Sequence, residues 1–213
     1  MVTGRFARPG SGIACYHPTA AAAHDDGKDR RAGEGRIMTG KEFLAAVANA
    51  QTDVIRALLG VLEEARAAHC VIGGLAVNAY AEPVVSLDVD IVVGTADIES
   101  VRRAAESRGF EVQPFEHSVN LSRPGSDLRV QIQTDPRYQA FLDRAVEADL
   151  LGYRMRVARR EDVLQGKIWA WSDARRRRSK RQKDLADIMR LVEADPSLAG
   201  ALPDAVREAI GGP

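Results

Sequence analysis

The sequence predicts an α/β (α+β) fold, in which helices flank a mixed sheet and a helical segment follows at the C-terminal end. Short apolar runs typical of strands lie between residues 70 and 134, and segments with apolar residues at helical spacing lie between and after them. A chain of 213 residues, 45% of them hydrophobic, is long enough to bury one substantial core. We therefore expect one principal domain.

Three parts of the chain differ in pattern. Residues 1–37 are rich in Gly, Ala, Arg and Asp without apolar periodicity, which predicts a disordered head. Residues 38–160 form the expected core, and residues 161–213 a helical segment that packs on it. Because a helical pattern follows Met38 directly, the translation start is open between Met1 and Met38.

The first elements of the core are a helix, a strand and a tight turn. Apolar residues at three-and-four spacing predict one amphipathic helix over residues 43–67, covering the sheet. Residues 70–72 form a short strand that ends in Gly73-Gly74, and a helix over residues 75–80 follows. The unit is strand, turn, helix.

The remaining elements complete a mixed sheet. Residues 87–93 predict a second strand, and Thr95 is expected to cap a helix that ends near Gly109. A turn sequence at residues 124–127 separates two alternating runs and predicts a hairpin. The expected segments are a helix over 97–108, extended structure over 110–112, strands over 119–122 and 128–134, and helices over 161–171, 182–194 and 203–210.

Composition excludes several classes of protein. No apolar run approaches the roughly 20 residues that cross a bilayer, and residues 1–37 lack the apolar segment of a signal peptide. The two cysteines, Cys15 and Cys70, indicate no disulfide framework. His69 and His117 lack partners at zinc-ligand spacing. We expect a cytoplasmic protein with no membrane partner.

Charge is balanced overall but not locally. The chain has 30 basic and 30 acidic side chains, yet Arg175 to Lys183 holds seven basic residues in nine positions. Such a tract favours a polyanionic partner such as RNA, because phosphate contacts dominate nucleic-acid binding. The alternative is a solvated helix face whose arginines pair with the acidic body of the protein.

Asp88 and Asp90 are the strongest candidates for chemistry. Residues two apart on a strand project to the same face, so the two carboxylates would lie side by side and need a cation. Mg²⁺ is bound by one or two carboxylates together with substrate phosphates. Glycines at Gly73-Gly74 would let backbone N–H groups approach a triphosphate. The alternatives are an exposed strand edge and an ordinary turn, and no Rossmann or P-loop pattern is present.

Two separated stretches carry a resemblance to a known family. Val71-Ile72-Gly73-Gly74-Leu75-Ala76, followed by Asp88-Val89-Asp90, resembles the nucleotidyltransferase superfamily related to DNA polymerase beta, particularly its AbiEii-like abortive-infection toxins. Gly166-Lys167-Ile168-Trp169-Ala170-Trp171 and Lys183-Asp184-Leu185-Ala186-Asp187-Ile188 are similar to the helical motifs of that family. The likeness covers residues 70–192.

The resemblance implies a role for each matching residue. Asp88 and Asp90 would bind Mg²⁺ or Mn²⁺. Lys167 would neutralise charge that develops on phosphate, and Asp184 would orient groups near it. The alternatives are a surface lysine and a local charge pair on one helical turn. The residues expected to bind the NTP are Gly73, Gly74, Ser86 and Lys183.

One departure concerns a third carboxylate, which members of the superfamily often supply from a later strand. The matching strand here carries Arg129, Gln131 and Gln133 on its polar face, and Asp135 just beyond it is a possible substitute. Because glutamine cannot serve as a carboxylate base, a noncatalytic nucleotide- or RNA-binding module stays open.

The function implied is transfer of a nucleoside monophosphate from an NTP to an acceptor hydroxyl. RNA, for instance a tRNA end contacted by the basic tract, is the favoured acceptor, and a small molecule, as in aminoglycoside-modifying relatives, is the alternative. The resemblance also implies a toxin that works beside an antitoxin protein.

Overall fold

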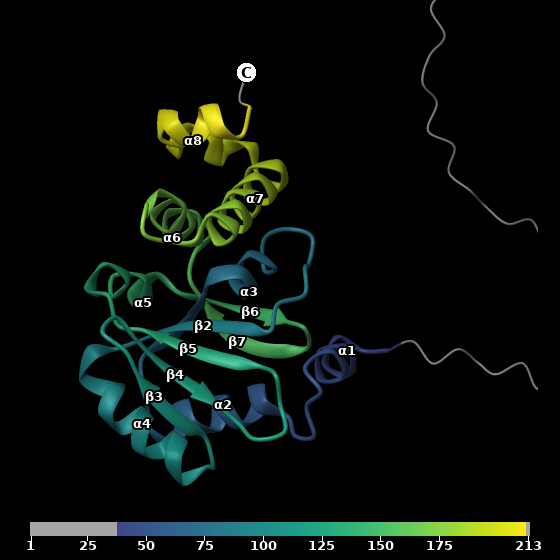
Figure 1. The fold of residues 1–213 in the computed structure, drawn as a ribbon, viewed down its shortest axis with the longest axis vertical. Coiled ribbons are helices and arrows are strands. Elements are labelled where there is room, and N and C mark those ends of the chain that lie inside the picture. Colours follow the sequence, from purple (N-terminus) through teal and green to yellow (C-terminus); the bar gives the residue numbers. More distant parts are fainter. Residues whose placement is uncertain (1–37, 212–213) are drawn as a thin grey trace, which may run out of the picture. The chain divides into compact units, whose positions relative to one another are not determined.

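The computed structural model describes residues 38–211; the head predicted to be disordered, residues 1–37, and residues 212–213 lie outside the described residues. A seven-stranded sheet has the order β3-β4-β5-β2-β1-β7-β6 (Figure 1). The pairs β2–β5 and β1–β7 are parallel and the other pairs antiparallel, which confirms the predicted mixed sheet. The strands are β1 (His69–Ile72), β2 (Asp88–Val93), β3 (Glu111–Pro114), β4 (Ser118–Ser122), β5 (Arg129–Gln133), β6 (Val146–Leu150) and β7 (Tyr153–Val157).

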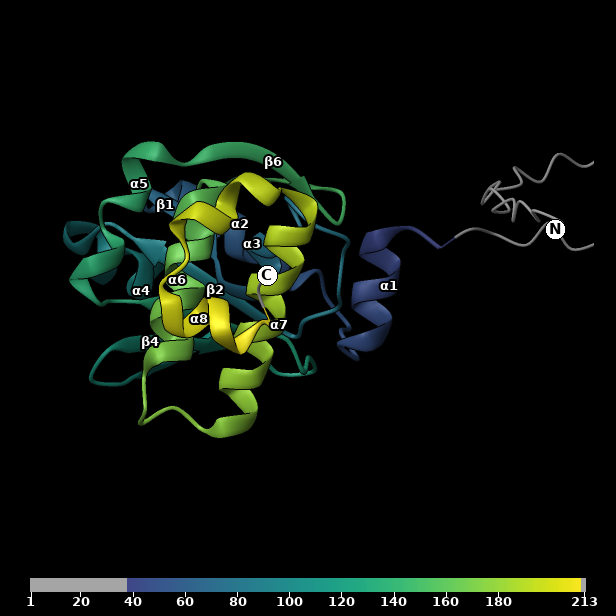
Figure 2. The same cartoon turned by 90° about the horizontal axis from the view of Figure 1, so that it is seen from above.

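Helices cover both faces of this sheet. In Figure 1, α2 and α4 lie on one face, and α3, α6 and α7 on the other, with α8 beyond them; Figure 2 shows α6, α7 and α8 from above. No helix within residues 38–211 is long and apolar enough to span a bilayer. The helices are α1 (Gly40–Val47), α2 (Val54–Glu64), α3 (Gly73–Val77), α4 (Ile98–Ser107), α5 (Phe141–Arg144), α6 (Arg160–Ser172), α7 (Arg178–Ala194) and α8 (Asp204–Ala209), with 3-10 turns η1 (Thr95–Asp97), η2 (Pro136–Tyr138) and η3 (Pro196–Ala201).

The single helix predicted over residues 43–67 is wrong, because the segment forms two helices. The helix α1 ends at Val47, and Asn49 adopts a left-handed conformation with φ 47°. The carboxylate of Asp53 then caps α2 by accepting the N–H of Arg56 at 2.9 Å. The cap at Asp53 therefore starts a second helix within the stretch of regularly spaced apolar residues.

Two other expectations need correction, and one hairpin was not expected. Thr95 begins the turn η1 without a side-chain cap, and α4 starts only at Ile98. The hairpin β6–β7 was not among the expected segments, and it turns at Leu151 and Gly152, both at positive φ. The helix α7 starts at Arg178 rather than residue 182, so most of the basic tract is helical.

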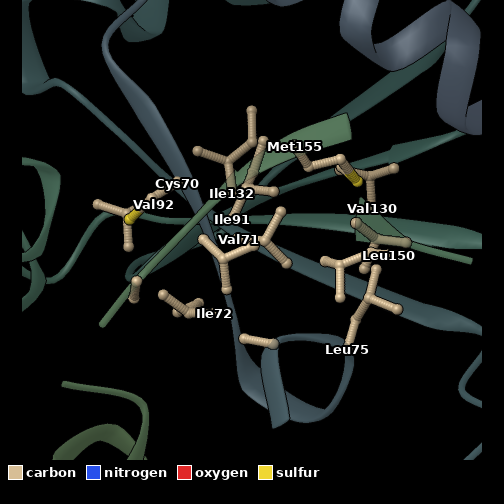
Figure 3. Close-up of a cluster of buried hydrophobic side chains, with 14 of the residues drawn as sticks. Cys70, Val71, Ile72, Leu75, Ile91, Val92, Val130, Ile132, Leu150 and Met155 are labelled. Atoms are coloured by element: carbon tan, nitrogen blue, oxygen red, sulfur yellow. The ribbon is translucent and has the colours of Figure 1, made fainter. Parts of the chain in front are cut away.

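The core lies at the centre of the sheet and fixes the direction of β2. Val89 and Ile91 are at most 1% exposed, while Asp88 and Asp90 alternate with them and project to the opposite face. Burying each such aliphatic side chain contributes about 1.5–3 kcal/mol, so a one-residue shift of β2 is strongly disfavoured. Buried residues around β1, β2 and β5, drawn in Figure 3, include Cys70, Val71, Ile72, Leu75, Val92, Val130 and Ile132.

Candidate active site

Asp88 and Asp90 lie on one face of β2, in the middle of the sheet. In the parallel pair with β5, Asp88 stands opposite Arg129 and Asp90 opposite Gln131. On the other side, Asp90 pairs with Ile72, the last residue of β1. The turn at Gly73 and the helix α3 therefore begin directly beside Asp90.

Gly73 makes room for the carboxylate of Asp90. Its φ is +69°, and a Cβ at this position would lie 2.1 Å from Oδ2 of Asp90. A side chain here would therefore be strained and would displace the carboxylate. At Gly74 a Cβ would meet Ser86 and Lys183 only at 3.8 and 3.9 Å, which is ordinary contact. Of the two glycines, only Gly73 is thus required because there is no space for a side chain.

Ser86 fixes the backbone at the start of β2. Its hydroxyl accepts the N–H of Asp88 at 3.3 Å and lies 3.2 Å from the carbonyl oxygen of Asp88, to which it donates. The Oγ also lies near Gly74 and lines the same cleft. The hydroxyl thus orients Asp88 at the edge of the cleft.

Burial raises the pKa of Asp90. The positive charge of Lys167 opposes this effect, and the negative charge of Asp88 adds to it. An ionised Asp90 is therefore unfavourable unless another cation lies close to it. A cation beside Asp90 would favour its ionised form.

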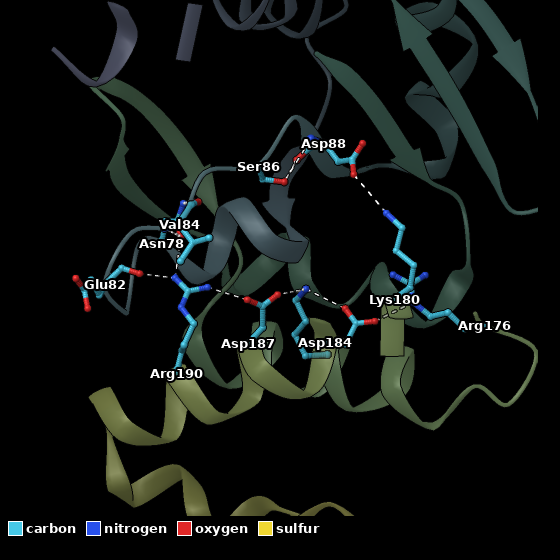
Figure 4. A network of polar contacts seen from close by, with 11 residues as sticks. Asn78, Glu82, Val84, Ser86, Asp88, Arg176, Lys180, Asp184, Asp187 and Arg190 are labelled. Atoms are coloured by element: carbon cyan, nitrogen blue, oxygen red, sulfur yellow. Dashed lines mark hydrogen bonds and ion pairs between the residues drawn. The ribbon is translucent and has the colours of Figure 1, made fainter. Parts of the chain in front are cut away.

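Lys167 of α6 is buried, so the interpretation as a surface lysine is wrong. Its side chain is 7% exposed, and Nζ lies 3.0 Å from Asp184 and 2.6 Å from Asp187, both on α7. Asp184 also pairs with Arg176 at 2.8 Å, and Asp187 with Arg190 at 2.7 Å (Figure 4). Asp184 therefore holds Lys167 in place from a second helix. Its contacts extend beyond the local charge pair on one helical turn that was the alternative interpretation.

Sequence reasoning gave no role to Arg190, which extends this network to the loop before β2. Its guanidinium donates to the side-chain oxygen of Asn78 at 3.0 Å and to the carbonyl of Glu82 (Figure 4). Asn78 in turn holds the backbone of Val84 through two hydrogen bonds. The only signal in the sequence is the i,i+3 spacing of Asp187 and Arg190, which is common on exposed helices.

The basic tract forms one wall of the site. Lys180 lies 3.7 Å from Asp88, and Arg176 pairs with Asp184, so part of the tract contacts acidic residues as the alternative interpretation expected. Those acids, however, belong to the candidate site. A cleft of about 280 Å³ joins these groups, and its lining includes Gly74, Ser86, Asp88, Asp90, Asn120, Arg129, Gln131, Lys167, Arg176, Arg177, Lys180, Lys183 and Asp184.

A third carboxylate does not join the pair. Gln131 occupies the position beside Asp90, and no group of three Asp, Glu, His or Cys residues able to hold a metal occurs in the part of the chain that the structure describes. Asp135, the proposed substitute, pairs with Arg137 at 2.6 Å and lines a different pocket. Hydrogen bonding from Arg137 lowers the pKa of Asp135. The prediction that Asp135 takes the place of the third carboxylate is therefore wrong.

Comparison with solved structures shows a shared fold. The crystal structure of ANT(2'')-Ia in complex with adenylyl-2''-tobramycin matches with a TM-score of 0.54 and 12% identity, covering 74% of this chain and 97% of that one. The solution structure of the antibiotic-resistance factor ANT(2'')-Ia matches with a TM-score of 0.50 and 14% identity, covering 74% and 89%. At these identities the likeness shows the fold alone. Comparison with curated proteins finds no match.

The sequence from residue 85 to residue 211 matches the family described as "Nucleotidyl transferase AbiEii toxin, Type IV TA system". This range contains Asp88, Asp90, Lys167 and Asp184, and begins after the Gly73-Gly74 turn. The resemblance read from the sequence is confirmed, and the nucleotidyltransferase fold agrees with it. The chain belongs to the AbiEii family and is a nucleotidyltransferase.

Proposed function

We propose that the protein transfers a nucleoside monophosphate from an NTP to a hydroxyl of RNA, with Mg²⁺ or Mn²⁺ bound by Asp88 and Asp90. The observation that carries this proposal is the cleft in which the two carboxylates face a wall of cations. A triphosphate needs the cations, and the metal that accompanies it needs the carboxylates. The release of pyrophosphate completes the reaction.

The residues present suit a hard divalent ion. Asp90 is held where burial raises its pKa, so a cation beside it relieves an unfavourable charge. Two carboxylates are enough for Mg²⁺, which keeps several water ligands and takes others from substrate phosphates. A bound Mg²⁺ would neutralise charge on the transferring phosphate. Gln131 adds an uncharged amide beside the pair.

Side chains of the chain itself position the nucleotide. Lys167 is fixed by Asp184 and Asp187 and acts on Asp90 as a nearby positive charge, so it is placed to stabilise charge that grows in the transition state. Lys183 approaches Gly74 from α7 and has no ion-pair partner among the described residues. We assign Lys183, with Gly73, Gly74 and Ser86, to the triphosphate.

Charge in the cleft favours a polyanionic acceptor. Six cationic side chains and three carboxylates line it, which leaves an excess of three positive charges. An NTP with one Mg²⁺ carries roughly two negative charges, so the loaded cleft stays positive. A polycationic aminoglycoside is disfavoured there, whereas an RNA end such as that of tRNA is attracted along the tract from Arg175 to Lys183. Such an activity would suit a toxin that an antitoxin protein restrains.

A noncatalytic nucleotide- or RNA-binding module is the second candidate. The observation that favours it is the uncharged Gln131 beside Asp90, where a third carboxylate would otherwise complete the metal site. Such a module would bind nucleotide without releasing pyrophosphate.

The test is transfer of label from each α-labelled NTP to total cellular RNA, with Mg²⁺ or Mn²⁺. We expect the parent to label RNA, and Asp88→Ala and Asp90→Ala to lose the activity. Arg154→Ala, which removes an exposed residue of β7 outside the cleft, is the matched control and should keep it. Nucleotide binding without transfer by the parent would favour the noncatalytic module. Label on aminoglycosides but not on RNA would show a small-molecule acceptor.

A further inference from the structure

Two cations hold the carboxylate of Asp88, one on each oxygen. Nε of Arg129, on the neighbouring strand β5, lies 3.3 Å from Oδ1, and Nζ of Lys180, on α7, lies 3.7 Å from Oδ2. Figure 4 shows Lys180 reaching across the cleft to Asp88. The carboxylate that we assign to the metal is therefore already paired from two sides.

These ion pairs are of the kind that exchanges easily. The side chains of Arg129 and Lys180 are 69% and 39% exposed, and that of Asp88 is 34% exposed. Ion pairs with this much solvent contact contribute little to stability. Lys167, by contrast, is buried between two carboxylates and cannot leave without exposing them. Among the six cationic side chains of the cleft, Lys167 is thus fixed, whereas Arg129 and Lys180 can move.

A divalent metal at Asp88 and these two side chains exclude one another. Arg129 and Lys180 would stand within a few ångströms of a doubly charged ion, and like charges at such distances repel strongly. Both side chains are long and flexible, and both line the cleft that also contains Gly74, Ser86 and Lys183. The triphosphate assigned to that cleft supplies anionic oxygens to which they can turn.

We propose that Arg129 and Lys180 are nucleotide-binding residues that pair with Asp88 when no metal is bound and move to the phosphate oxygens of the NTP when a metal takes their place. The inference rests on the proposed function of the cleft. It makes metal and nucleotide interdependent: the two side chains compete with metal alone, and they strengthen nucleotide binding once metal is present.

The first arm of the test measures binding of Mn²⁺ alone, from the electron paramagnetic resonance signal of the free ion. We expect Arg129→Met and Lys180→Met each to bind Mn²⁺ roughly two- to fivefold more tightly, because a competing exposed ion pair has been removed. Arg154→Met is the matched control: Arg154 of β7 carries the same charge, is exposed and does not line the cleft. Its Mn²⁺ affinity should equal that of the parent.

The second arm measures binding of nucleotide at saturating Mn²⁺. The probes are the four α,β-methylene nucleoside triphosphates, which cannot release pyrophosphate. We expect Arg129→Met and Lys180→Met each to bind the preferred analogue roughly tenfold more weakly, since each loses a charge-assisted contact to phosphate. Arg154→Met should again behave as the parent. Thermal melting of every variant checks that the fold is retained.

The two arms together identify the exchange. Tighter Mn²⁺ binding with weaker nucleotide binding supports it, and loss of both would show a merely structural role. Tighter Mn²⁺ binding with unchanged nucleotide binding would overturn the transfer to phosphate. Unchanged Mn²⁺ binding would overturn the competition at Asp88. A parent that binds none of the four analogues would refute the proposed function itself, an outcome distinct from any effect confined to the variants.

Discussion

Gly73 and Asp90 are matched in shape, because a Cβ on residue 73 would lie 2.1 Å from the carboxylate oxygen Oδ2 of Asp90. The left-handed backbone at Gly73, with φ +69°, adds a second penalty for any side chain there. The residue directly after β1 therefore both starts α3 and leaves space for the carboxylate on β2. This relationship can be tested by two single substitutions.

Gly73→Ala should lower the free energy of unfolding by about 1–2 kcal/mol from backbone strain alone, with a further loss from the displaced carboxylate. Gly74→Ala, one residue along, meets only ordinary contacts and should change stability by less than about 1 kcal/mol. Urea unfolding of the two variants measures the difference in stability. Equal stabilities would contradict the close approach of Gly73 to Asp90.

The buried pairing of Lys167 should dominate the stability of the interface between α6 and α7. Lys167→Met leaves Asp184 and Asp187 without their shared cation and should cost about 3–5 kcal/mol. Arg154→Met breaks an ion pair with Glu147 whose arginine is 83% exposed, and should cost less than about 1 kcal/mol. Both are measured by denaturant unfolding. Similar costs would mean that the network around Lys167 is solvated.

Asp90 should make stability depend on pH in a direction opposite to that of most carboxylates. Burial raises its pKa in the folded protein, so the folded state takes up this proton more readily than the unfolded state. Stability from this group is therefore gained as pH falls through the raised pKa, and ionised Asp90 is destabilising above it. Asp90→Asn should melt at a higher temperature than the parent at pH 8, with the difference shrinking toward pH 4.

The control for this experiment is Asp88→Asn, because Asp88 is partly exposed and already paired with Arg129 and Lys180. It should show no comparable gain at pH 8. Added Mg²⁺ should raise the melting temperature of the parent and not of Asp90→Asn. A parent more stable than Asp90→Asn at pH 8 without metal would mean that Lys167 outweighs the effect of burial.

Local patterns in the sequence were sufficient for part of the fold and of the site. The alternation around Val89 and Ile91 predicted both the strand β2 and the common face of Asp88 and Asp90. The break between α1 and α2 was missed because the helical spacing of apolar residues continues across it. The break is set locally, by the side chain of Asp53, which caps the start of α2. The hairpin β6–β7 was not predicted, although Val146–Leu150 and Tyr153–Val157 both alternate apolar and charged residues, as half-buried strands do.

Ion pairs between side chains on different helices and strands could not be predicted from the sequence. The partners of Lys167 lie 17 and 20 positions away on another helix, and spacing alone does not indicate that the two helices face each other there. The approach of Lys180 to Asp88 joins residues from distant parts of the chain. From the sequence alone a basic tract is interpreted as a surface patch, because only the fold shows which acidic residues it contacts.

Gln131 is the position at which the candidate metal site can be completed by design. Its side chain stands beside Asp90 in the β2–β5 pair, so Gln131→Glu would place a third carboxylate there. Without metal, the added like charge should destabilise the fold by about 0.2–1 kcal/mol. With metal, a third charged ligand should tighten Mn²⁺ binding roughly tenfold, and transfer at limiting Mn²⁺ should rise accordingly.

Gln133→Glu is the matched control for this change. Gln133 lies two residues further along the same face of β5, and its side-chain oxygen already accepts the N–H groups of Thr134 and Asp135. It stands opposite Val92 rather than a carboxylate, so Mn²⁺ affinity should change little. If Gln131→Glu binds Mn²⁺ no better than this control, residue 131 does not face the bound cation. Asp88 and Asp90 would then hold the metal without help from β5.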